Sequence, residues 1–266
     1  MNAIHLDLVD LVAAAVLVVA SAAASVALSL QVHRALLWAA ARMVVQLLLI
    51  GLLLRVVLTS GSAWATALVV LAMMAAAARE VAVRPARRLR HGLANYRIGA
   101  MVVGASSVAV VGLALLTALR PAPWYDPRYT IPLMGIVLGT VLNSASLALD
   151  SFYGGLEASR SAIEARLALG ATLREALAPL ALVSLRRGLI PLINQMSAAG
   201  IITLPGIMTG QLLAGMDPVE AAKYQILLLL LMAGGGCLAS GAAIHLACLH
   251  VGDGRQRLRL DRLQGK

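Results

Sequence analysis

The stretch at residues 219–249, VEAAKYQILLLLLMAGGGCLASGAAIHLACL, is apolar along almost its whole length. A bilayer has a hydrocarbon core of about 30 Å, which a helix of about 20 mostly apolar residues can cross. Together with this stretch, the sequence predicts seven transmembrane helices, at approximately residues 8–30, 36–58, 62–78, 98–119, 129–149, 187–213 and 219–249. The predicted fold class is therefore all-α, a polytopic bundle of transmembrane helices.

The composition of the 266 residues supports the same class of fold. Hydrophobic residues make up 61% and charged residues only 13% of the chain, and the mean hydropathy is +0.88. Soluble domains are about 45–50% apolar and about 25% charged, so this chain is not one of them, and it also lacks the charge-rich composition of disordered proteins. No segment outside the predicted spans is long enough for a separate catalytic domain. We therefore expect residues 1–266 to form a single transmembrane domain.

The positions of the basic residues predict how the helices cross the membrane. Of the 22 Lys and Arg residues, 18 fall in segments that face the cytoplasm if the N-terminus lies outside. Cytoplasmic loops of membrane proteins carry an excess of Lys and Arg, so the predicted orientation is N-out and C-in. Because the net charge of +10 is concentrated beside the membrane, we expect membrane lipid rather than nucleic acid as a partner.

The sequence carries none of the common motifs of hydrolytic or nucleotide-hydrolysing enzymes. It has no G-x-x-x-x-G-K-[ST] phosphate loop, no H-E-x-x-H zinc motif and no G-x-S-x-G nucleophile turn. We therefore expect no catalytic residues and no cofactor bound by this chain. Cys237, His245 and Cys248 in the last span are residue types that bind soft metals, but free cysteine is more often a small buried hydrophobe. The sequence identifies no metal site.

The segment between the fifth and sixth predicted spans, residues 150–187, is the most informative part outside the membrane. Ser161 with Glu164, and Thr172 with Glu175, match the S/T-x-x-E capping box of helix N-termini. Gly170 lies between them, where a helix can end in a left-handed turn. The sequence predicts a helix, a sharp break and a second helix. This element is either an amphipathic hairpin on lipid headgroups or a docking element for a partner.

The sixth predicted span is the least able to remain a straight helix, because it contains Pro191, Pro205, Gly206 and Gly210. Interrupted helices place polar backbone at membrane depth in transporters. We therefore place a substrate pathway on this span and add polar residues of the second and fifth spans. The candidate pathway residues are Gln46, Asn143, Asn194, Met208, Thr209 and Gln211. The alternative is that these side chains form hydrogen bonds between helices, each worth about 0.6 kcal/mol.

Several motifs between about residues 35 and 250 resemble the signature of the FetB-type iron-export ABC permeases, a family whose plant relatives are associated with aluminium tolerance. The motifs are Ile131-Pro132-Leu-Met134-Gly135, Gly188-Leu-Ile-Pro191-Leu-Ile-Asn194, Leu204-Pro205-Gly206-Ile-Met208-Thr209-Gly210 and Ala214-Gly215-Met-Asp217-Pro218. The sequence departs from the family pattern at Ile207, where the family has Met, and at Thr140, where it has Asn. Each departure removes one candidate metal ligand.

The resemblance implies a permease subunit that pairs with itself and with two separate cytoplasmic ATPase subunits, whose ATP hydrolysis drives the export of iron. Within the inner loop, Glu-Ala-x-x-x-x-Gly resembles the segment that ABC permeases insert as a coupling helix into a groove of the ATPase. The coupling residues that this implies are Glu164, Ala165, Arg166, Gly170 and Arg174. The low Lys content beside abundant Arg and Ala is typical of a GC-rich bacterial genome, and we expect the protein in the bacterial cytoplasmic (inner) membrane.

Two other classes of protein remain open at this point. An ion-coupled secondary transporter normally holds a buried carboxylate or histidine as its coupling group, and the centres of the predicted spans contain none. A non-transporting membrane scaffold would need neither the interrupted sixth span nor the capped inner loop. The residues alone specify neither the transported species nor the direction of transport.

Overall fold

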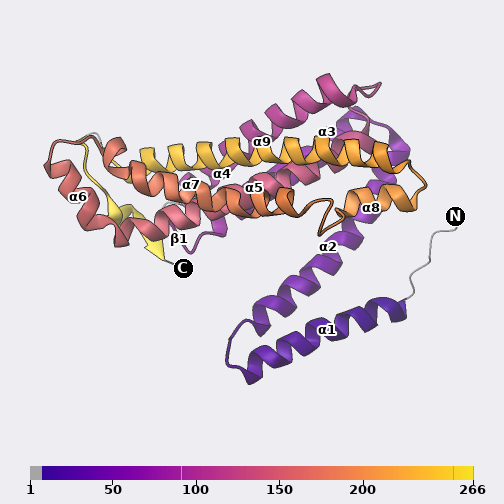
Figure 1. The fold of residues 1–266 in the computed structure, drawn as a ribbon, viewed down its shortest axis with the longest axis horizontal. Helices are drawn as coiled ribbons and strands as arrows, with labels where there is room; N and C mark the ends of the chain where they lie inside the picture. Colours follow the sequence, from indigo (N-terminus) through magenta and orange to yellow (C-terminus); the bar gives the residue numbers. More distant parts are fainter. Residues whose placement is uncertain (1–7, 91, 254, 266) are drawn as a thin grey trace. The chain divides into compact units, whose positions relative to one another are not determined.

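The computed structural model describes residues 8–90, 92–253 and 255–265, and Figure 1 shows their path. Among these residues, seven helical segments are long and apolar enough to cross a membrane, as predicted: α1, α2, α3, α4 with its continuation η1, α5, α7 and α9. The elements are α1 (Leu8–Ala27), α2 (His33–Ser60), α3 (Ala63–Val83), β1 (Arg87–Leu89), α4 (Gly92–Leu113), the π-helical turn η1 (Ala114–Leu119), α5 (Pro127–Ala158), α6 (Arg160–Ala168), α7 (Leu173–Ala198), α8 (Gly206–Leu213), α9 (Pro218–Val251), the 3₁₀ turn η2 (Leu260–Arg262) and β2 (Leu263–Gly265).

The chain divides into two compact units, and the first is a hairpin of α1 and α2 together with residues 213–215. In the turn of the hairpin, the Ser25 hydroxyl accepts a hydrogen bond from the backbone N–H of Val32 at 3.2 Å. The helix α2 ends at Gly61, whose φ of +57° is left-handed. Few residues in the most apolar stretch of each helix are buried inside the protein, 11% in α1 and 6% in α2, as expected for helices that face lipid.

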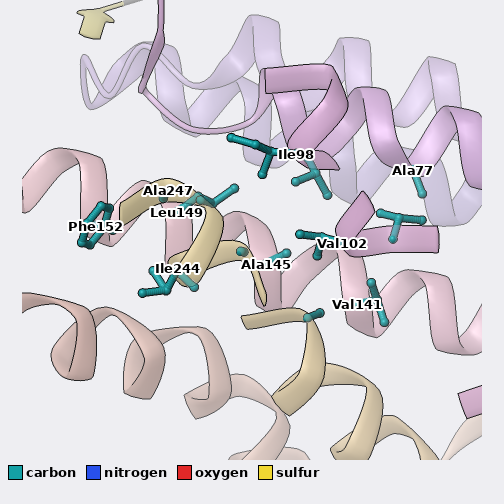
Figure 2. Packing of buried hydrophobic residues seen from close by; sticks show 14 of the residues in the cluster. Ala77, Ile98, Val102, Val141, Ala145, Leu149, Phe152, Ile244 and Ala247 are labelled. Carbon is teal, nitrogen blue, oxygen red and sulfur yellow. The ribbon is translucent and has the colours of Figure 1, made fainter. Parts of the chain in front are cut away.

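The second unit is a bundle built around α5, which packs against α3, α4, α7 and α9. Its core is rich in β-branched and small side chains beside leucines and the aromatic Phe152 and Tyr153. Figure 2 labels four of the smaller ones: Val102 of α4, Val141 and Ala145 of α5 and Ala247 of α9. Lipid tails are as apolar as this core, so transmembrane helices associate through close packing of small residues rather than through the hydrophobic effect. The composition of the core follows from that requirement.

The helices α5, α7 and α9 approach one another closely at Gly188 of α7. A Cβ atom added to Gly188 would lie 2.7 Å from the backbone oxygen of Ser144 on α5 and 2.9 Å from the hydroxyl of Ser240 on α9. Since real Cβ atoms do not come this close to other heavy atoms, only glycine allows the three helices this separation. Gly188 therefore sets the spacing of α5, α7 and α9.

One end of the bundle, at the left of Figure 1, carries β1, α6 and the segment that follows α9, and we call it the basic end. The arginines on these segments, just after α3 and β1 and at the start of α7 are Arg84, Arg87, Arg88, Arg90, Arg160, Arg166, Arg174, Arg255, Arg257, Arg259 and Arg262. The strands β1 and β2 pair there in antiparallel register, with Arg88 opposite Gln264. At the opposite end, Trp64 and Trp124 are 86% and 64% exposed. Exposed tryptophans of this kind are enriched where helices meet the membrane–water interface.

The region predicted as the inner loop, residues 150–187, is mostly helical, because α5 continues to Ala158 and α7 already begins at Leu173. The predicted helix, break and helix are present as α6, a left-handed turn with a φ of +91° at Gly170, and α7. The capping box of Thr172 and Glu175 is also present, with the backbone N–H of Thr172 donating to the Glu175 carboxylate at 2.8 Å.

The predicted capping box of Ser161 and Glu164 is wrong. The helix α6 starts two residues earlier than this box requires, at Arg160, and the Ser159 side chain at the N-cap makes no capping hydrogen bond. Glu164 instead accepts a hydrogen bond from Nε of Arg160 at 2.8 Å. Arg160 and Glu164 are four residues apart and can meet only if the helix includes both, so this ion pair competes with the capping arrangement.

The sixth span is interrupted as predicted, but not at every residue expected. The helix α7 runs through Pro191, the break comprises residues 199–205, and α8 begins at Gly206 directly after Pro205. The prediction that Pro191 breaks the helix is wrong, because a proline removes one backbone hydrogen bond and transmembrane helices tolerate this. The prediction for Gly210 is wrong as well, since Gly210 lies inside α8.

Candidate functional site

The break between α7 and α8 is a turn that satisfies part of its own backbone. Gly200 has a φ of +84°, and its N–H donates to the backbone oxygen of Thr203 at 2.9 Å. The N–H of Thr203 donates to the backbone oxygen of Ala198 at 3.0 Å. The side chains of Ile201 and Ile202 at the tip are 91% and 80% exposed, so they point away from the bundle. Irregular backbone at membrane depth occurs only where protein or an aqueous cavity covers it.

The candidate pathway residues on and near this break have different environments. Asn194, one turn before the end of α7, is exposed, whereas Met208, Thr209 and Gln211 on α8 are half-buried. The Thr209 hydroxyl donates to the backbone oxygen of Pro205 at 3.2 Å, which occupies it within its own helix. The side-chain oxygen of Gln211 is buried and has no hydrogen-bond partner within the described part of the chain. Gln46 is exposed on α2, in the first unit.

An exposed stripe runs along one side of α5 and contains the polar residues Asn143 and Asp150 together with the apolar Leu147. Gly139, Asn143 and Asp150 are exposed on this side, at spacings of four and seven residues that place them above one another on a helix. The stripe lies between the side of α5 where Ser144 approaches α7 and the side that approaches α3. We call it the α5 stripe.

An arginine just after α3 reaches across to the α5 stripe. Nη1 of Arg84 donates to the side-chain oxygen of Asn143 at 2.7 Å, and its Nε donates to the Glu80 carboxylate at 3.3 Å. Below them, the Asp150 carboxylate accepts a hydrogen bond from the backbone N–H of Ala86 at 2.7 Å. Asn143 lies about 24 Å along α5 from Pro127, at about 1.5 Å per residue, so it falls within a hydrocarbon core of about 30 Å. The stripe therefore brings a paired guanidinium close to the membrane interior.

A small cavity of about 70 Å³ opens beside Asn143, between α5 and α7. Its lining is Thr140, Asn143, Ser144, Gly188, Pro191, Leu192 and Gln195. The structure thus brings together Asn143 and Pro191 from the predicted site, whereas Asn194, Met208, Thr209 and Gln211 do not line this cavity. The cavity offers amide and hydroxyl oxygens and is roomy enough for a few water molecules or a small ion.

Sequence reasoning did not connect Arg84 or Thr140 with this region, whereas Gln195 is one of the polar residues of the span predicted to carry the pathway. The spacing of Glu80 and Arg84 predicts their ion pair, which the structure contains at 3.3 Å. The contact of Arg84 with Asn143 joins positions 59 residues apart, so no local pattern could indicate it. Gln195 follows Asn194 directly and was visible only as another polar residue of the sixth span.

The described residues do not form a group of three or more His, Cys, Asp or Glu side chains that could hold a metal ion. The two cysteines of α9 are free thiols, Cys237 exposed and Cys248 half-buried.

The helix α6 at the basic end packs on the core through the buried Ile163 and the half-buried Leu167. Ile163 is only 2% exposed, whereas the predicted coupling residues Glu164, Ala165 and Arg166 are exposed. Leu169, at the tip of the turn next to Gly170, is 88% exposed. The remaining coupling residues, Gly170 and Arg174, are exposed as well. The element thus presents charged groups and one large apolar side chain outward, which fits both a docking element and a hairpin on headgroups.

Comparisons with known proteins support a common family. The model of a family described as an uncharacterised protein family, UPF0014, matches residues 8–251. A UPF0014 membrane protein of Synechocystis is 40% identical over 74% of this chain and 75% of its own length. The UPF0014 membrane protein STAR2 of Oryza sativa is 33% identical over 86% of this chain and 78% of its own length. The probable iron export permease protein FetB of Escherichia coli is 28% identical over 100% of both chains.

No solved structure matches the chain. The resemblance to the FetB-type permeases that the sequence motifs indicate is confirmed by the family match and by these relatives.

Proposed function

Because the chain belongs to the UPF0014 family, we propose that it is the permease subunit of an ABC exporter that transports iron across the bacterial inner membrane. On this proposal residues 1–266 act as one permease domain. Support for iron comes from the relative named as a probable iron export permease, which aligns with the whole chain. Export by this chain requires a partner that hydrolyses ATP, since the sequence has no phosphate loop.

The observation that carries the coupling part of the proposal is the exposure of α6. Nine residues form this helix between α5 and α7, so a force on α6 acts directly on two long helices of the bundle. We propose that Glu164, Ala165, Arg166, Gly170 and Arg174 form the surface that docks to the ATPase. The exposed Leu169 would enter an apolar groove of that partner, which would bury a side chain that otherwise faces water.

The α5 stripe supports a permease homodimer. Exposure of Asn143, Asp150 and the adjoining arginine to lipid tails would be costly, because polar groups at membrane depth need polar or protein partners. A second copy that covers this stripe would convert it into a closed, polar passage between two subunits. Within the second unit, the proposed pathway comprises Asn143, Asn194, Met208, Thr209 and Gln211, with Thr140 and Gln195 from the cavity beside Asn143. Gln46 of the first unit is proposed as a further pathway residue by its polarity alone.

Iron fits the oxygen donors of this passage. Ferric iron is a hard cation that prefers oxygen ligands, and the cavity beside Asn143 supplies amide and hydroxyl oxygens. The charge of Arg84 is balanced there by Glu80, so the arginine does not by itself repel a cation. The cavity of about 70 Å³ suits an ion with few waters better than a large chelate.

The experiment that tests this function is the metal content of cells under iron load, measured by elemental mass spectrometry. A deletion strain would be compared with strains that carry the wild-type gene, Gly170→Val or Gly61→Val. Both glycines have a left-handed backbone conformation, and an added Cβ would meet no atom within 4 Å at either position. Gly61→Val therefore controls for backbone strain alone. We expect iron to accumulate in the deletion and Gly170→Val strains, and not in the other two.

Each alternative predicts a different result in these strains. Unchanged iron in every strain would refute iron as the cargo. Normal export by Gly170→Val would refute the coupling role of α6 and favour the alternative that α6 is part of an amphipathic hairpin on lipid headgroups. Purification of the chain with an ATPase would separate an ABC exporter from an ion-coupled carrier or a scaffold, which need no such partner.

A further inference from the structure

A second and larger cavity, of about 800 Å³, opens between α7 and α9 at the basic end. Its walls are formed by the first three turns of α7, the last three turns of α9 and the segment that follows α9. The lining residues are Leu173, Arg174, Leu177, Ala178, Ala181, Leu182, Gly241, Ile244, His245, Cys248, Leu249, Gly252, Asp253, Gln256 and Arg262. None of them belongs to the proposed pathway, so a ligand of this cavity is independent of iron as the cargo. Arg174 is also one of the proposed coupling residues, and lipid binding is therefore measured on the protein without an ATPase.

The polarity of this cavity changes along its length. At the end nearer the middle of the bundle the lining is apolar, with Ala181, Leu182 and Gly241. At the other end it is polar and basic, with Arg174 and Arg262. Gly241 lies ten residues before Val251, where α9 ends, which corresponds to about 15 Å along a helix. A phospholipid has the same arrangement over a similar length, with a charged head at one end and apolar chains at the other.

The depth of the cavity also matches a lipid of the adjoining leaflet. The helix α9 has 34 residues and is therefore about 51 Å long, whereas a bilayer with its headgroups is about 40–45 Å thick. If Pro218 lies near the surface marked by the exposed Trp64 and Trp124, the last turns of α9 reach the headgroups of the other surface. Arg174 and Arg262 then lie at headgroup level, and the apolar part of the cavity lies beside the acyl chains.

The cavity is open sideways, toward where lipid would be. Leu182 on α7 and Leu249 on α9 line it and are nevertheless 59% and 63% exposed. Large apolar side chains that are exposed on a transmembrane bundle face the acyl chains of the membrane. A lipid could therefore enter between the two helices without any rearrangement of the core.

The charges at the polar end favour an anionic head. Asp253 is the one carboxylate in the lining, and it lies 3.3 Å from Nε of Arg257 and 3.9 Å from Nη1 of Arg259, so its charge is balanced. Within the described ranges, no carboxylate forms an ion pair with Arg174. Arg262 donates Nη1 to the backbone oxygens of His250 and Gly252 at 2.9 and 2.8 Å, which fixes its guanidinium in place.

We propose that this cavity binds one anionic phospholipid of the inner leaflet. Its phosphate lies beside Arg174 and Arg262, and one acyl chain runs along Leu177, Ala181 and Gly241. Basic pockets between transmembrane helices on the cytoplasmic side are a known type of site for anionic headgroups. The ligand class is thus a diacyl phospholipid with a net negative head, such as phosphatidylglycerol.

Native mass spectrometry of the purified full-length protein tests the proposal. The protein would be exposed to palmitoyl-oleoyl phosphatidylglycerol or to the zwitterionic phosphatidylcholine with the same chains. Both lipids carry a phosphate, but the choline cation cancels its charge in phosphatidylcholine. We expect the wild type to retain the anionic lipid at least about fivefold better, which corresponds to about 1 kcal/mol for one arginine beside a headgroup of net negative charge. Arg174→Gln should abolish this preference.

A second variant tests the apolar part of the cavity without changing any charge. An added Cβ at Gly241 would meet no atom within 4 Å, so the side chain of Gly241→Leu fits and fills the space of the acyl chain. This variant should lose most of its binding of both lipids. The matched controls are Arg255→Gln, with the same loss of charge outside the lining, and Gly234→Leu, at an exposed and equally open position of α9.

Three results would overturn the proposal. The first is equal retention of both lipids by the wild type. The second is an equal loss in Arg255→Gln and Arg174→Gln, which would mean that the charge of the whole surface attracts lipid. The third is unchanged binding in Gly241→Leu, because the cavity would then not hold the chain.

Discussion

Substitution of Gly188 by alanine should destabilise the bundle, although alanine is the better helix former. A Cβ at this position would lie 2.7 Å from the Ser144 oxygen, 2.9 Å from the Ser240 hydroxyl and 3.0 Å from Cβ of Ala148. The first of these neighbours is backbone and cannot rotate away, so α7 must move outward. Such overpacking costs about 1–3 kcal/mol, and the gain from replacing a helical glycine with alanine is about 1 kcal/mol.

Gly234→Ala is the matched control, because Gly234 is also helical and has no atom within 4 Å of an added Cβ. Both variants gain the same helix propensity, so the difference between their free energies of unfolding isolates the clash, at about 2 kcal/mol. For a chain of this size, 1 kcal/mol shifts the melting temperature by about 2–4 °C, and the two variants should differ by about 4–8 °C. Thermal unfolding in detergent, followed by tryptophan fluorescence, measures this difference. Equal melting temperatures, or a more stable Gly188→Ala, would refute the close approach of the three helices.

Three further predictions concern the basic end. Leu169→Ser should uncouple a partner ATPase from transport and leave thermal stability unchanged, because the side chain is 88% exposed. Ile163→Ser should lower the free energy of unfolding by about 2 kcal/mol or more, because Ile163 is only 2% exposed. An equal loss of stability in both variants would contradict this prediction. Thr172→Ala removes a capping hydroxyl and should cost about 1 kcal/mol, measured by thermal unfolding, whereas no change would mean that the box does not hold the start of α7. The Arg259 guanidinium, which donates a hydrogen bond to the Asp261 carboxyl, lowers the pKa of that carboxyl from 3.8 to about 2. The contribution of this pair to the stability of the folded protein should therefore be complete above pH 4 and lost as the pH falls through 2. An NMR titration of Asp261 with a midpoint near 3.8 would contradict the pairing.

The sequence predicted the number of spans well, because bilayer thickness imposes a minimum length on each apolar stretch. It could not predict where the helices end beyond the hydrocarbon. In α5 the helix continues past Asp150 because Phe152 and Tyr153, 0% and 1% exposed, pack into the core. Composition does not reveal such packing, since the same residues could equally start a loop.

Predictions at the candidate site succeeded where the cause was local. The Thr172 box and the turn at Gly170 depend on neighbouring residues, and both are present. The prediction for Ser161 was wrong because a second local arrangement, the pair of Arg160 with Glu164, was equally available. The contact of Arg84 with the α5 stripe depends on how α3 and α5 pack, which no pattern in the sequence specifies. The assignment of the pathway and coupling residues to a function stays a prediction.

The pairing of β1 with β2 has a consequence for the biogenesis of this chain. About 170 residues separate the two strands, and a ribosome that adds about 5–20 residues per second needs roughly 10–35 s to make them. During that interval four more transmembrane helices must enter the membrane while β1 waits without its partner strand. A chaperone, or a lipid headgroup bound to its arginines, could occupy β1 in the meantime. The basic end would then close only after the last helix has been inserted, and its closure would mark a fully inserted chain.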